Sequence, residues 1–329
     1  MTNQVESTAP SSKHGTKKKR PYVTVVVAVL VIASLAVGAW CVYSRSTTDS
    51  KQDLLLKAGL LGSGKQTLKI GVRDDLPGIA LQQNGSFEGF DIDIAYAIAN
   101  YLGFPRDKVE LYPIKIQERE GMVVYKDGKL MQLDLVIAAY SITTAREKAG
   151  VKFSMPYFRT KQAAITRADQ QGVVQSLGDL KGEGEGKGVC TIASSTAVDS
   201  LKKAGIDSMG RDSIGQCVEA VKDKKFFAVQ SDAAILAGFA VKDIKHLKMH
   251  NIGVDFSEKW GVSIRPDREE TPYVLQLVNA ALYEISRKGE WKDMFDKHFG
   301  QTQASLGGSV VIANNEPPGI PVPTIRDYQ

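Results

Sequence analysis

Three polar side chains in one short stretch have the types and spacing needed to bind an anion. Ser141, Thr143 and Arg146 follow the apolar run of residues 133–139, which predicts a buried strand, and residues 144–148 predict the start of a helix. Backbone amides and the positive end of a helix favour an anion at such a turn. The guanidinium of Arg146 can bind both oxygens of one carboxylate. We therefore expect a carboxylate site; a capped turn with a solvated arginine is the alternative.

The string SITTAREKAGVKFSMPYF, which begins at Ser141, resembles the signature of the polar amino acid binding proteins that supply ABC importers. The resemblance runs from about residue 67 to about residue 300. It implies an α/β fold of two lobes, the periplasmic-binding-protein-like type II fold with a two-strand hinge. It also implies that Arg146 and Ser141 bind the ligand's α-carboxylate, while the backbone carbonyl of Ala139 accepts a hydrogen bond from the ligand's ammonium group.

Two motifs in the second half of the chain extend this resemblance. AVQSDAAILAG resembles the motif whose aspartate neutralises the ammonium group, here Asp232, although the same residue could simply cap the following helix. IASSTAVD resembles a turn whose hydroxyls and amides contact the ligand, here Ser195 and Thr196. Ser194 stands where relatives have glycine, so the usual shape of this turn depends on whether the position needs a positive φ.

Two further arginines bear on which amino acid is bound. In members that bind glutamate and aspartate, a basic residue occupies the position of Arg73, and Arg119 lies where an acidic side chain is held in relatives. Two guanidinium groups in one pocket call for a second carboxylate on the ligand. We expect L-glutamate first and L-aspartate second. The alternative is that both arginines form ion pairs with neighbouring acids such as Asp75 and Glu118.

Alternating strand and helix patterns predict two layered α/β lobes with mostly parallel sheets. In the first lobe we expect a helix over residues 118–129, and in the GFDIDIA motif we expect Asp91 and Asp93 to hold the start of a helix. The hinge is expected at residues 158–163 and 252–261. The predicted divisions are a cytoplasmic basic tail (1–21), a transmembrane anchor or signal (22–43), a linker (44–66), lobe 1 (67–160 and 254–300), lobe 2 (161–253) and a C-terminal tail (301–329).

The N-terminal segment predicts attachment to a membrane. Residues 22–43 form an uncharged, mostly apolar run directly after a KKKR cluster, long enough to span a bilayer with its N-terminal side in the cytoplasm. A cleaved signal peptide is the alternative. Either reading places the binding domain outside the cell. Residues 1–20 contain five basic side chains and one acidic one, which leaves a net charge of only +1 on the rest, so nucleic acid binding is not expected.

Export has a consequence for the cysteines. Cys190 and Cys217 could form a disulfide in an oxidising compartment, and two buried free thiols are the alternative. The four histidines are scattered, so neither a metal site nor a cofactor is expected. We expect a monomer, tethered at the cell membrane, that binds an amino acid without catalysis and passes it to the permease subunits of an ABC importer. A sensory ectodomain and a cyclohexadienyl dehydratase-like enzyme are the competing interpretations.

Overall fold

The computed structural model describes residues 26–27, 29–37, 48–181, 188–253, 258–306 and 315–328. Ser50–Tyr328 form one compact unit. Residues 26–27 and 29–37 are helical, and the rest of the predicted membrane segment, residues 22–43, lies outside the described residues. No helix in the described ranges is both long and apolar enough to span a bilayer. The anchor therefore stays a prediction.

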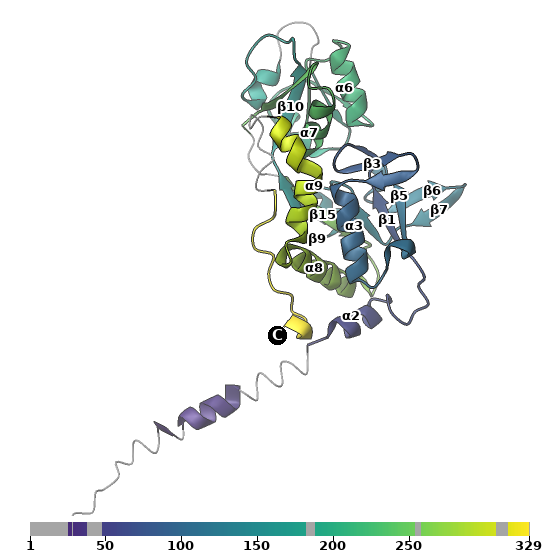
Figure 1. Ribbon diagram of the computed structural model, residues 1–329, viewed down its shortest axis with the longest axis vertical. Coiled ribbons are helices and arrows are strands. Elements are labelled where there is room, and N and C mark those ends of the chain that lie inside the picture. The colour runs from purple at the N-terminus through teal and green to yellow at the C-terminus, as the bar shows by residue number, and fades with distance from the viewer. Residues whose placement is uncertain are drawn as a thin grey trace, which may run out of the picture. The chain divides into compact units, whose positions relative to one another are not determined.

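Lobe 1 is built on a mixed five-stranded sheet with the order β5-β1-β8-β15-β9 (Figure 1). Its strands are β1 (Leu68–Val72), β5 (Val109–Pro113), β8 (Leu135–Ile137), β9 (Lys152–Thr160) and β15 (Glu258–Ile264). The strands β5, β1 and β8 are parallel, whereas β15 pairs antiparallel with both β8 and β9. The helices α3 (Phe90–Tyr101), α8 (Thr271–Arg287) and α9 (Glu290–Ser305) pack together, with α3 and α8 against the sheet.

Lobe 2 repeats this plan with the strand order β12-β11-β13-β10-β14. Its strands are β10 (Gln162–Arg167), β11 (Val189–Ile192), β12 (Ser208–Arg211), β13 (Ala228–Asp232) and β14 (Leu247–Asn251). Its helices are α5 (Thr196–Lys203), α6 (Ile214–Lys222) and α7 (Ala233–Lys242), and η3 (Leu177–Lys181) is a 3₁₀ turn. The chain leaves lobe 1 between β9 and β10 and returns between β14 and β15, where residues 254–257 are not described. The first crossing agrees with the predicted hinge at residues 158–163.

One predicted element in lobe 1 is wrong. Residues 118–129 were expected to form a helix, but the 3₁₀ turn η2 (Ile116–Glu118) is followed by a hairpin of β6 (Val123–Lys126) and β7 (Lys129–Gln132). Asp127 and Gly128 both have positive φ, at 51° and 75°, which is the backbone of a tight hairpin turn. The remaining small elements are β2 (Asp75–Leu76), β3 (Ala80–Gln83), β4 (Ser86–Glu88), η1 (Arg106–Lys108) and α4 (Thr144–Lys148).

The segments flanking the two lobes are more ordered than the linker and tail that we expected. Ser50 caps α2 (Lys51–Lys57) in a capping box with Asp53, and Leu54 is fully buried under this helix. The C-terminal segment Asn315–Tyr328, which ends in η4 (Arg326–Tyr328), buries Ile325 and joins α2 through an Arg326–Asp53 ion pair at 2.8 Å. The helix α2 and the segment 315–328 therefore both contribute to lobe 1.

Candidate functional site

The predicted turn after β8 forms as expected and places Arg146 beside the boundary between the lobes. Thr143 caps α4 by accepting a hydrogen bond from the backbone N–H of Arg146 at 3.2 Å. The Arg146 guanidinium donates to the carbonyl of Ser141 at 2.6 Å and to the carbonyl of Ser194, in lobe 2, at 3.4 Å. Because α4 spans only five residues, the guanidinium is the principal positive group of this turn.

Arg119 joins Arg146 in the same cluster. Its guanidinium is buried and donates to the carbonyl of Ala138 at 3.3 Å. Burial and then the positive charge of Arg146 lower the pKa of Arg119 to about 9, while the charge of Asp232 acts in the opposite direction. The guanidinium groups of Arg119 and Arg146 both lie over the ring of Tyr140, at 4.3 Å and 4.7 Å from its centroid, and the charge of Asp232 acts on Arg119 from nearby. One buried and one half-buried cation beside a buried acid make a site that favours an anion.

Arg73 is held differently. It is buried, and its Nε and Nη2 atoms donate to the carboxylate of Asp75 at 2.7–2.9 Å. Its charge still adds to the positive field acting on Arg119. The ion pair with Asp75 is the alternative that the sequence left open, and it already satisfies several of the Arg73 donors. Arg119 is therefore the stronger candidate for holding a second carboxylate.

Asp232 comes from lobe 2 and lies between β13 and α7. The Asp232 side chain makes no capping bond to α7. Instead, Asp232 Oδ2 accepts a 2.7 Å hydrogen bond from the indole Nε1 of Trp260, which lies on β15 of lobe 1. Burial, and then the negative charge of Glu258, raise the pKa of Asp232 well above its usual value, and the charges of Arg146 and Arg119 oppose this rise. A ligand cation would relieve the cost of ionising this buried carboxyl group.

Asp91 has a role that the sequence did not reveal, as does Trp260 through its hydrogen bond to Asp232. Asp91 lies in the first turn of α3, as expected, but its buried carboxylate also accepts hydrogen bonds from the backbone N–H of Ala139 at 2.8 Å and from the hydroxyl of Tyr157 at 2.9 Å. Burial raises the pKa of Asp91 to about 7 against the effect of these two bonds. Ala139 has a φ of 44°, so Asp91 stabilises an unusual backbone at the predicted ammonium acceptor.

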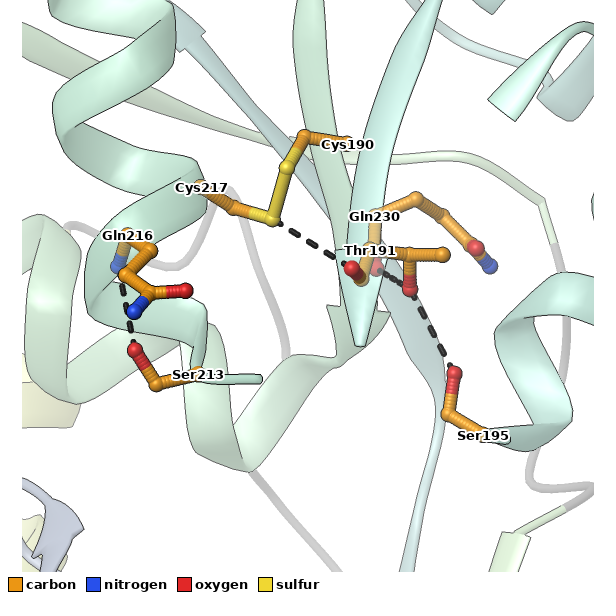
Figure 2. The surroundings of a disulfide bond; sticks show 7 residues. All are labelled: Cys190, Thr191, Ser195, Ser213, Gln216, Cys217 and Gln230. Atoms are coloured by element: carbon orange, nitrogen blue, oxygen red, sulfur yellow. Dashed lines mark hydrogen bonds between the residues drawn. A yellow bond between two sulfur atoms is a disulfide. The ribbon is translucent and has the colours of Figure 1, made fainter. Parts of the chain in front are cut away.

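The turn before α5 places Ser195 and Thr196 at the start of that helix. Ser194 has a φ of 60°, so serine adopts here the left-handed conformation that glycine would adopt at lower cost. Ser195 is the N-cap residue without a side-chain cap bond, and its Oγ lies 3.4 Å from the hydroxyl of Thr191 (Figure 2). The ligand contacts expected of Ser195 and Thr196 stay predictions.

A disulfide braces lobe 2 behind this turn. Cys190 on β11 and Cys217 on α6 are joined, and both are fully buried (Figure 2). Cys217 Sγ lies 3.4 Å from the carbonyl oxygen of Thr191, which follows Cys190 in the strand. The pairing expected in an oxidising compartment is therefore present, and α6 is fixed to the strand that leads to Ser195. In the described part of the chain, no group of three potential metal ligands was found.

Comparison with known proteins agrees with this architecture. A model of the bacterial extracellular solute-binding proteins, family 3, matches residues 68–301. The glutamate-binding protein GluB of Corynebacterium glutamicum is 26% identical over 262 residues, which cover 76% of this chain and 82% of GluB. The glutamine-binding protein of Geobacillus stearothermophilus is 28% identical, covering 67% of this chain and 84% of that protein.

A solved structure extends the comparison to three dimensions. An ancestral arginine-binding protein bound to glutamine has a TM-score of 0.60 and 30% identity, covering 71% of this chain and 98% of its own. The family match spans both lobes, the hinge and every candidate ligand-binding residue from Arg73 to Asp232. The chain therefore belongs to the bacterial extracellular solute-binding proteins, family 3.

Proposed function

We propose that this protein binds an acidic amino acid, L-glutamate before L-aspartate, and delivers it to the permease subunits of an ABC importer. The observation that carries the proposal is the clustering of Arg119 and Arg146 over the ring of Tyr140, with the charge of Asp232 close enough to act on both. Within the described residues, no carboxylate oxygen lies within 4.0 Å of either guanidinium group. These cations are therefore available to an anion supplied from outside the chain.

The charges of the site favour a ligand with two carboxylates. Arg119 and Arg146 contribute two positive charges, and an ionised Asp232 contributes one negative charge. Glutamate or aspartate would bring one carboxylate for each guanidinium group and one ammonium group for Asp232, so each of these three charges would gain an opposite partner. Glutamine would leave one buried positive charge without a partner, and arginine would leave two. Because an uncompensated buried charge costs several kcal/mol, the acidic ligands should bind most tightly.

The relatives support the binding of an amino acid more strongly than they support the choice of glutamate. GluB proteins from two Corynebacterium species are named for glutamate, whereas other relatives are named for glutamine or arginine. The proposed preference for an acidic side chain therefore depends on Arg119, and the proposed binding of the ligand's α-carboxylate depends on Arg146. We further propose that the protein is a monomer tethered outside the cell by residues 22–43.

Calorimetric titration of the full-length protein with glutamate, aspartate, glutamine and arginine tests the proposal. Glutamate or aspartate should bind, with glutamine weaker by at least about tenfold, because a lost charge pair at a buried site is worth more than about 1.4 kcal/mol. Thermal unfolding gives a second readout, since a ligand at 100 times its Kd stabilises the folded protein by about 2.7 kcal/mol. Tighter binding of glutamine or arginine than of either acidic amino acid would reject the assignment.

A further inference from the structure

One aromatic ring contacts both cations of the site. The Cζ atoms of Arg119 and Arg146 lie over the ring of Tyr140, at 4.3 Å and 4.7 Å from its centroid. Tyr140 is 3% exposed, and its ring meets Phe153 edge-on at 4.9 Å. Two like charges in a buried site repel each other, and the face of an aromatic ring attracts both of them. The ring therefore offsets part of the repulsion between the two arginines.

The backbone holds Tyr140 firmly in this place. Its carbonyl accepts a hydrogen bond from the N–H of Gly261 at 3.0 Å, and the next residue, Ser141, forms an isolated bridge with Trp260. A Cβ atom at Gly261 would lie only 2.9 Å from the side chain of Ile142, so the strand and the turn approach closely here. Tyr140 is thus anchored to β15, the same strand that supplies the hydrogen bond to Asp232.

Tyr140 acts through its ring and not through charge. Burial raises the pKa of its phenol, against the effect of the two neighbouring arginines, so the side chain is neutral at physiological pH. A neutral ring attracts a guanidinium group through its quadrupole, which phenylalanine shares and an aliphatic side chain lacks. The hydroxyl should therefore be dispensable, whereas the ring should not.

We propose that Tyr140 is a positioning residue that sets the relative placement of Arg119 and Arg146, and so the preference of the site for ligands with two carboxylates. This inference rests on the proposed function. Arg146 faces the carboxylate common to all amino acids, and Arg119 faces the carboxylate that only acidic ligands have. Loss of the ring should therefore weaken binding of every amino acid and weaken binding of glutamate the most.

The test compares Tyr140→Phe and Tyr140→Met in the full-length protein by calorimetry with glutamate and with glutamine. The phenylalanine variant should bind both within about threefold of the wild type. The methionine variant should lose about tenfold or more in glutamate affinity, and its ratio of glutamate to glutamine affinity should fall at least about threefold. Tyr96→Met is a matched control, because the Tyr96 ring contacts Arg106, at 3.9 Å, on another part of lobe 1. That control should bind both ligands as the wild type does.

A double-variant experiment tests whether Tyr140 affects the ratio of glutamate to glutamine affinity through Arg119. In an Arg119→Met background, Tyr140→Met should no longer change the ratio of glutamate to glutamine affinity. An unchanged ratio in the single methionine variant, or equal losses in the phenylalanine and methionine variants, would overturn the positioning role while leaving glutamate binding in place. Wild-type protein that binds neither glutamate nor aspartate would reject the proposed function and this inference together. If circular dichroism shows that Tyr140→Met is unfolded, Tyr140→Leu replaces it.

Discussion

Replacing Asp232 by asparagine should weaken ligand binding and remove its pH dependence. The asparagine keeps the shape of the side chain and an acceptor for the indole of Trp260, but it cannot carry the negative charge that is expected to face the ligand's ammonium group. Asp232 is 5% exposed, so the ammonium would be buried without an anion. Breaking a buried charge pair in this way costs about 3 to 5 kcal/mol, which corresponds to a Kd raised roughly a hundredfold to a few thousandfold.

The pH dependence follows from the direction of the pKa shift. Burial and Glu258 raise the pKa of Asp232 in the ligand-free protein. A bound ammonium group favours the ionised carboxylate, so the pKa of Asp232 falls in the complex. Between the two pKa values, binding releases a proton and the logarithm of the affinity rises with pH by up to about one per unit. Asp232→Asn cannot release this proton, so its affinity should not change across the same range.

Calorimetry in two buffers with different ionisation enthalpies at one pH measures the protons released. Wild-type protein should release up to about one proton with glutamate and the same number with glutamine, because both ligands carry the ammonium group. Asp93→Asn is the matched control: Asp93 is paired with Lys297 and His298, and these bonds lower its pKa despite partial burial. An asparagine variant at position 232 that binds within threefold of the wild type, with no proton release in the wild type, would refute the reasoning.

Three further predictions concern the site and its framework. Arg146→Ala should weaken glutamate binding by about 3 kcal/mol or more, because it leaves a buried carboxylate unpaired, and calorimetry with a change below threefold would remove Arg146 from the site. Replacing Cys190 and Cys217 together by alanine should lower the free energy of unfolding by about 3 to 4 kcal/mol, as expected for a loop closed across 27 residues, and urea denaturation beside the reduced wild type checks this. Deleting residues 307–329 should lower that free energy by about 2 to 4 kcal/mol, since Ile325 and its contacts leave lobe 1; an unchanged urea midpoint would show that the segment contributes nothing.

Local patterns were sufficient for much of the fold and for part of the site. Arg146 lies in the short helix that follows the apolar strand β8, and Asp232 ends the apolar strand β13 directly before α7, so this order of elements brings polar side chains to the ends of buried strands. The two lobes likewise follow from repeated strand and helix periods. Such signals lie within about ten residues of chain, so they can be recognised without knowledge of tertiary contacts.

The features that sequence reasoning missed depend on longer-range contacts or on competition between local signals. Trp260 meets Asp232 across the hinge, 28 residues away in sequence, and no spacing rule links them. In residues 118–129 the apolar residues form one continuous run at 122–125, and the β-propensity of Val123 and Val124 together with the Asp127–Gly128 turn signal favours a hairpin over a helix. Arg73 has an acid two residues away, and only coordinates show that this local pair forms.

The indole of Trp260 places a fluorophore one hydrogen bond from the carboxyl group that is expected to meet the ligand. Its ring stacks on Phe158 at 4.5 Å and is fully buried, so its emission reports on this interior environment and not on bulk solvent. Of the three tryptophans, Trp291 donates instead to the carbonyl of Tyr157, and Trp40 lies outside the described residues. If Asp232 ionises when a ligand binds, the electric field at the Trp260 ring changes, and occupancy could then be followed optically without attaching a dye.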